Sequence, residues 1–137
     1  MMAARRFVLS TCMFALASCA QERDMSPLAR GAVDEFHARL KNRQYEAIFA
    51  AATEDFRRSM GTTTSALFAR ISTTLGVPVS SQLTRLQVNH MTRGPSLQVQ
   101  CQTQYTRGVL YEQFTWRVER DRVRLVAYGA GIPAPDR

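Results

Sequence analysis

In the first half of the chain, apolar residues recur at intervals of three and four, the spacing of a helix that buries one face. The first run follows Ser26 and Pro27, which we interpret as the N-cap and a first-turn residue of a helix. The last run follows a group of threonines and stops at Gly76 and Pro78. The pattern predicts two or three short helices. The apolar positions are Ala29, Ala32, Val33, Phe36 and Leu40, then Tyr45, Ile48, Phe49, Ala52 and Phe56, then Leu67, Phe68, Ile71 and Leu75.

From about Ser81 the apolar spacing changes to every second residue, which is typical of a strand with one dry face and one wet face. The clearest run is "SLQVQCQTQYTR". It places Leu97, Val99, Cys101, Thr103 and Tyr105 on one face, and Gln98, Gln100, Gln102 and Gln104 on the other. We interpret the glutamines as a solvated sheet face, with a binding surface as the alternative. Cys101 is then a small buried hydrophobe rather than a nucleophile.

A tight turn at Arg107 and Gly108 would fold this strand back onto the next one. The cross-strand pairs that this turn predicts share one face: Tyr105 with Leu110, Thr103 with Glu112, Cys101 with Phe114, Val99 with Trp116, and Leu97 with Val118. A second turn near residues 120–122 predicts a last strand whose inner residues are Val123, Leu125 and Ala127. A preceding strand with Leu86, Val88 and His90 completes the predicted meander.

Helices followed by a meander predict an α+β fold. Two or three N-terminal helices would pack on the dry face of a curved four-stranded antiparallel β-meander. This domain would occupy residues 27–131, with residues 132–137 as a C-terminal tail. Removal of residues 1–18 would leave 119 residues, which suffices for one domain and not for two.

The segment "MMAARRFVLSTCMFALAS" has the charged, apolar and small-residue order of a secretory signal. Its apolar run of about ten residues would form a helix about 15 Å long, half the thickness of a bilayer core. The last residues of this segment, Leu16, Ala17 and Ser18, together with Cys19, resemble the lipobox of bacterial lipoproteins. That resemblance implies a signal peptide over residues 1–18, acylation of Cys19 by chains such as palmitate, and a short tether over residues 19–26. Two or three acyl chains would give lasting membrane attachment.

Other interpretations of this segment remain open. An ordinary cleaved signal could end in cysteine, and Arg5 with Arg6 resembles a twin-arginine export signal. A metal or redox pair fits poorly, because Cys12 lies in the apolar run and no Cys or His partners follow at ligand spacing. Enterobacterial lipoproteins with aspartate after the cysteine stay in the inner membrane, so Ala20 and Gln21 favour the outer membrane here. We expect a lipid-anchored, periplasm-facing envelope protein.

The charge of the mature chain changes this interpretation little. Without residues 1–18 the chain has 16 Lys and Arg against 11 Asp and Glu, a formal charge of +5. The arginines are scattered, so we interpret the charge as solvation, with attraction to anionic envelope lipids as the alternative. We expect no nucleic-acid partner and no cofactor.

Three segments suggest a fold family: "FHARLKNRQYEAIFAAATEDFRRSM", "LFARISTTLG" and "LYEQFTWRVERDRVRLVAYG". In this order they resemble the cystatin-like, nuclear-transport-factor-two-like cone, and more closely a family of small bacterial envelope domains of unknown function. The resemblance covers about residues 28–130. It departs from the family pattern at the last turn, where the tryptophan is displaced to Trp116 in the third strand and Val123 follows the turn. Isomerases and dehydratases of this fold keep acid and base residues inside the cone, and dimers are common among them.

Glu112 is the one charged residue that the predicted register places on the inner face. An ionised, unpaired carboxylate there would cost several kcal/mol, so Glu112 needs a partner, a raised pKa or a position at the rim. With Tyr105, Tyr45 or His37 it is a candidate for catalytic proton transfer. The alternative is a rim glutamate bonded to Thr103 or to an arginine. His37 and His90 have no second carboxylate at ligand spacing, so we predict no metal site.

Two functions follow. The favoured one is a non-catalytic envelope lipoprotein whose domain binds an envelope protein or a second copy of itself. The alternative is a small-molecule binder or isomerase-like enzyme that uses the cone interior around Glu112. A filled interior around Val99, Phe114 and Trp116 would argue against the enzyme, and an open apolar pocket that exposes Glu112 would favour it.

Overall fold

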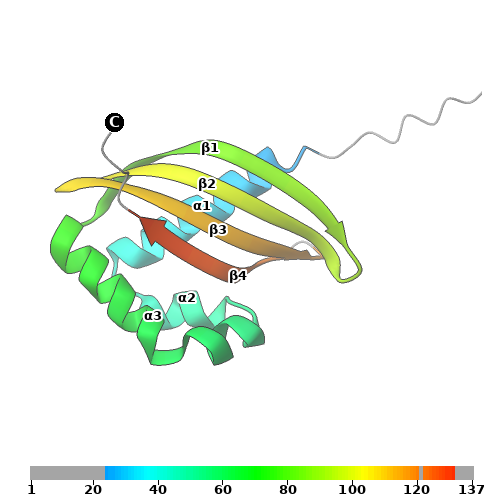
Figure 1. Cartoon of the computed structure of the whole chain (residues 1–137), viewed down its shortest axis with the longest axis horizontal. Coiled ribbons are helices and arrows are strands. Elements are labelled where there is room, and N and C mark those ends of the chain that lie inside the picture. Colours follow the sequence, from blue (N-terminus) through cyan, green and yellow to red (C-terminus); the bar gives the residue numbers. More distant parts are fainter. Residues whose placement is uncertain (1–23, 121, 132–137) are drawn as a thin grey trace, which may run out of the picture.

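The structure, a computed structural model, describes residues 24–120 and 122–131. Three helices precede four strands: α1 (Ser26–Lys41), α2 (Tyr45–Ala50), α3 (Glu54–Leu75), β1 (Pro78–Met91), β2 (Gly94–Tyr105), β3 (Gly108–Glu119) and β4 (Arg122–Gly131). The strands form one antiparallel sheet in the order β1-β2-β3-β4. Helix α1 crosses one face of this curved sheet, and α2 and α3 lie beside β4 (Figure 1). The predicted α+β class and the four-stranded meander are therefore confirmed.

Helix α1 buries the face that its sequence period predicts. Its buried residues are Ala29, Val33, Phe36, His37 and Leu40. The predicted capping role of Ser26 is wrong, because Ser26 is the first helical residue and Met25 precedes it as the cap. The Ser26 backbone N–H donates instead to Asp24 Oδ1 at 3.0 Å. Pro27 lies in the first turn, where its missing N–H costs nothing.

The second and third helices divide the chain differently from the prediction. Helix α2 ends at Ala50, and Phe56 lies in α3 rather than continuing α2. The Thr53 side chain caps α3 by accepting a hydrogen bond from the Phe56 N–H at 3.2 Å. Gly61 then interrupts α3 with a φ of 35°, a value that glycine adopts without a side-chain clash. The threonine-rich stretch follows this kink and begins the second of two helical segments within α3, where the sequence pattern predicts a helix to begin.

The turn between β2 and β3 lies one residue earlier than predicted. Tyr105 pairs with Gly108, so the loop is Thr106 and Arg107. Every predicted partner moves by two positions: Cys101 lies opposite Glu112 and Val99 opposite Phe114. The inner face is nevertheless correct, because a shift of two residues preserves the alternation. The turn is held against the end of α3, since the Arg107 N–H donates to the Leu75 carbonyl at 2.9 Å.

A β-bulge in β4 overturns the prediction for the last strand. Leu125 pairs with Trp116 and Ala127 pairs with Thr115, so Val126 is an extra residue between them. Beyond the bulge the faces exchange: Ala127 is exposed, and Tyr128 is buried opposite Phe114. The predicted inward position of Ala127 is therefore wrong. His90, also predicted on the inner face, is exposed near the end of β1.

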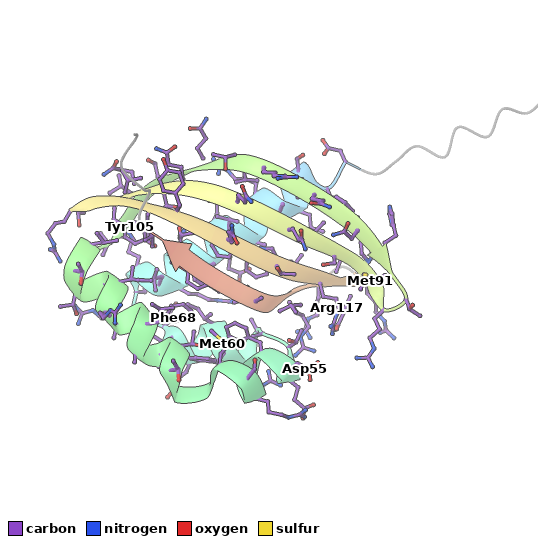
Figure 2. All side chains as sticks on the ribbon, in the orientation of Figure 1. Asp55, Met60, Phe68, Met91, Tyr105 and Arg117 are labelled. Atoms are coloured by element: carbon purple, nitrogen blue, oxygen red, sulfur yellow. The ribbon has the colours of Figure 1, made fainter. Side chains whose placement is uncertain are left out.

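One hydrophobic core fills the space between the helices and the sheet. Its buried members run from Ala29 to Tyr128, so the three helices and the sheet share this core. Phe68 of α3 and Tyr105 at the end of β2 are both core residues, whereas Met91 lies at the tip of the β1–β2 hairpin and is exposed (Figure 2). Within residues 24–120 and 122–131, no helix is long and apolar enough to cross a membrane.

Candidate functional site

Glu112 is the centre of a buried polar cluster. Its side chain is 1% exposed on the inner face of β3. Oε1 lies 2.8 Å from His37 Nε2, and Oε2 accepts hydrogen bonds from the Tyr128 hydroxyl at 2.6 Å and the Tyr105 hydroxyl at 3.3 Å. We call these four residues, His37, Tyr105, Glu112 and Tyr128, the Glu112 cluster. One carboxylate thus receives partners from one helix and two strands.

Neighbouring aromatic rings hold the cluster in place. His37 follows Phe36 in α1, and its ring meets Phe114 edge-on at 6.1 Å between centroids. Phe36 contacts the Tyr128 ring at 5.0 Å, which fixes the tyrosine where its hydroxyl reaches the carboxylate. The pairing of Phe114 with Tyr128 depends on the bulge at Val126. The geometry of the cluster therefore follows from ordinary core packing around it.

The cluster favours an ionised carboxylate. Burial alone would raise the pKa of Glu112, but the hydrogen bond and charge of His37, helped by Thr103 and Tyr128, bring it below its ordinary value. Burial and the negative charge of Glu112 raise the pKa values of Tyr105 and Tyr128, so both hydroxyls stay protonated and donate. With Glu112 ionised, His37 Nε2 is the donor of the third hydrogen bond. The result is an anion held by three donors.

The interior around this anion is filled. Val99 and Phe114 are each 1% exposed, and Trp116 is 6% exposed. Glu112 lines neither of the two surface pockets described here. The smaller one, about 190 Å³, touches His37 and is otherwise lined by Asp34 and residues 78–81. The carboxylate is therefore shielded from solvent in this structure, and a carboxylate with a lowered pKa that already accepts three hydrogen bonds is a weak base for proton transfer.

The structure brings together only some of the predicted site residues. Glu112, Tyr105 and His37 meet, but Tyr45 bonds elsewhere, with its hydroxyl 3.1 Å from Ser72 Oγ. The alternative of a rim glutamate bonded to an arginine is wrong, because Glu112 is fully buried and its bonded partners are His37 and two tyrosines. The Thr103 hydroxyl faces the carboxylate but makes no hydrogen bond within 3.5 Å.

Tyr128 is the member of the cluster that the sequence pattern missed. Strict alternation along β4 assigned the inner position to Ala127, and the extra residue Val126 reverses that assignment. The sequence contained one indication of the bulge. Strict alternation would bury the small Ala127 and expose the large Tyr128, which buries less apolar area than the reverse arrangement. A bulge is the usual device that exchanges two such neighbours.

The remaining cysteine and histidine positions do not form a second site. Cys101 is buried, and burial with the nearby Glu112 charge raises the pKa of its thiol to about 12, which keeps it protonated and unreactive. In the part of the chain that the structure describes, no group of three or more His, Cys, Asp and Glu side chains could hold a metal ion. Cys19, the predicted lipidation site, lies outside the described residues.

The lowered pKa of Glu112 predicts a loss of stability in acid. The native state holds the carboxylate ionised more strongly than the unfolded chain does, so its contribution is present above the ordinary pKa of 4.5 and lost as pH falls through the lower native value. His37, Tyr105 and Tyr128 are the titratable groups that contact it directly. Urea unfolding of the wild type and Glu112→Gln at pH 7 and pH 3 measures this contribution. The stability difference between them should shrink at pH 3, and a constant difference would contradict the prediction.

No family model, curated protein or solved structure matches this chain. The case for its function therefore depends on the sequence features and on the geometry described above.

Proposed function

We propose that this chain is a membrane-anchored bacterial envelope lipoprotein whose domain acts by binding rather than by catalysis. The observation that carries the proposal is the filled interior around Glu112, whose side chain lies among core residues and is 1% exposed. What the domain offers to other molecules is then its surface. The lipobox-like stretch from Leu16 to Cys19 supports the anchored, periplasm-facing location.

We further propose that the fold is a cone of the cystatin-like, nuclear-transport-factor-two-like kind. Two features of the sheet support this. The register of β1 shifts between Leu83 and Arg85, and the register between β3 and β4 shifts at the bulge at Val126. Both irregularities increase strand twist and bending. A strongly curved sheet that wraps an N-terminal helix is the defining shape of such a cone (Figure 1).

The anchor is tested by Cys19→Ser in the producing bacterium. Loss of the thiol removes the acylation site, so metabolic labelling with a fatty acid should disappear and the domain should be released from the membrane fraction or remain unprocessed. Cys12→Ser is the matched control, because it changes the other N-terminal cysteine and leaves the lipobox intact. Its labelling should equal that of the wild type. Labelling that persists in Cys19→Ser would contradict the anchor, and separation of the inner and outer membranes would test the expected outer location.

The binding role is tested by crosslinking in intact cells. The open sheet face is polar and accessible, and Gln102 lies on it with Tyr111 as its cross-strand partner. A photocrosslinking residue at Gln102 should capture an envelope protein or a second copy of this chain. A residue of the same type at Arg70, exposed on α3, is the control for non-specific capture. Equal products from the two positions would contradict a specific partner on the sheet face.

A further inference from the structure

A groove of about 580 Å³ lies between α1, the end of α2 and the first residues of β4. This volume is typical of small-molecule sites, which span about 300–1,000 Å³. Small residues make room for it on both sides: Gly31 and Ala32 on α1, and Ala50 and Ala51 where α2 ends. The opposite wall is fixed, because the Thr53 N–H donates to the Leu125 carbonyl at 2.9 Å and joins the α2–α3 linker to β4.

The groove has a mixed apolar and polar lining with a cationic border. Its apolar lining includes Leu28, Trp116, Val123 and Leu125. Three arginines, Arg39, Arg122 and Arg124, line it against one carboxylate, Glu35. Arg39 is paired with Glu35, and Arg124 with Glu119. Arg122 is exposed and forms no ion pair among the described residues.

Trp116 lines the groove from β3. Its side chain is 6% exposed, yet its indole N–H has no hydrogen-bond partner. Most buried donors in folded proteins are paired, because an unpaired one forfeits the hydrogen bond that it makes with water. The nitrogen atom is itself buried, so its unmade hydrogen bond is a property of the core rather than a contact offered to a ligand in the groove.

We propose that this groove binds a small amphipathic carboxylate, with its apolar chain along Leu28, Trp116 and Val123 and its carboxylate at Arg122. The proposal rests on the binding role above and specifies the class of ligand. A neutral apolar molecule would leave the arginine border without a counter-charge, and a cationic amphiphile would meet like charge. The volume also suits a small molecule better than a protein surface, which needs a larger and flatter contact.

The position of Trp116 provides the measurement. It is the only tryptophan in the chain, so its fluorescence reports on the groove alone. The experiment uses the chain from Ala20 without the lipid anchor, because the described core is contained in residues 24–131. Octanoate, kept below its micelle concentration, should change the emission saturably. Octylamine has a chain of the same length with the opposite charge, and acetate has the carboxylate without the chain. Neither compound should change the emission saturably.

Gly31→Leu is the decisive variant. A Cβ added at Gly31 meets nothing within 4 Å, so the new side chain can enter the groove without disturbing the fold. Leucine is also a better helix former than glycine, so thermal unfolding should occur at the wild-type temperature or above. The saturable octanoate response should nevertheless disappear. Ala38→Leu adds the same bulk at an exposed position of α1 outside the groove and should bind as the wild type does.

Arg122→Gln tests the contribution of the arginine charge. It should weaken octanoate binding about tenfold through loss of one charge-assisted contact. Arg70→Gln, an exposed arginine on α3, should leave affinity unchanged. Three results would each overturn the proposal: no saturable response to octanoate, an equal response to octylamine, or an unchanged response in Gly31→Leu. Such a failure would leave the lipid labelling and the crosslinking at Gln102 unaffected, so it is distinguishable from a failure of the proposed function.

Discussion

Glu112→Ala is expected to lower the free energy of unfolding by about 3–5 kcal/mol, because it leaves buried hydrogen-bond donors without their acceptor. Three groups would lose their acceptor at once: His37 Nε2 and the hydroxyls of Tyr105 and Tyr128. All three lie in the core, where water cannot replace the carboxylate without entering a packed space. Urea unfolding at pH 7, followed by circular dichroism, measures the loss.

Glu112→Gln separates charge from shape. The amide keeps an oxygen for one of the donors and nearly the same volume, so its cost should be smaller than that of alanine. Tyr128→Phe removes a single neutral donor and should cost about 0.5–1.5 kcal/mol. A loss below about 1 kcal/mol for Glu112→Ala, within the range of surface substitutions, would contradict the buried cluster.

Trp116→Ala is expected to cost about 3–5 kcal/mol, as truncation of a large buried aromatic does. The indole is 6% exposed and stacks on Phe114 at 5.5 Å between centroids and an interplanar angle of 13°. Alanine would leave a cavity beneath α1 and remove that stacking. Chemical unfolding at neutral pH, followed by circular dichroism because the only tryptophan is lost, measures the change.

Tyr111→Ala is the matched control for Trp116→Ala. Tyr111 is an aromatic residue on the same strand, but it faces outward and is 41% exposed. Its truncation should cost less than about 1 kcal/mol, since little apolar area leaves the core. Equal losses for the two variants would mean that the faces of β3 are not distinguished as described. Trp116→Phe should cost less than Trp116→Ala because it keeps a stacked ring and removes an N–H that has no partner.

The features predicted correctly from sequence are those that depend on local periodicity. The buried face of α1 and the alternation of β2 each follow from one repeating interval. The register between β2 and β3 was wrong by two positions because a two-residue shift leaves both faces unchanged, so the pattern does not distinguish the alternatives. Contacts of Thr106 and Arg107 with the end of α3 decide it, and those are distant in sequence.

The candidate site likewise combines residues that local periodicity predicts with contacts that depend on tertiary structure. Glu112 stood out because a charge on a dry face needs an explanation, and Tyr105 was found because it shares that face. His37 was one of the candidate partners, but the sequence did not decide between it and Tyr45, since the contact depends on how α1 crosses the sheet, 75 positions away along the chain. Tyr128 was missed because one extra residue in β4 reverses the alternation on which the prediction depended.

The bulge at Val126 has a consequence for aligning this chain with relatives. Because Val126 has no partner between Leu125 and Ala127, its deletion would turn β4 into a regular strand and keep Leu125 opposite Trp116 and Tyr128 opposite Phe114. A one-residue gap between Leu125 and Tyr128 is therefore compatible with the same core. A gap elsewhere in β4 would exchange its inner and outer faces unless a compensating insertion restored them. An alignment that places the gap by residue similarity alone would put the wrong residue opposite Phe114. It would then misidentify the residue that corresponds to Tyr128, whose hydroxyl donates to Glu112.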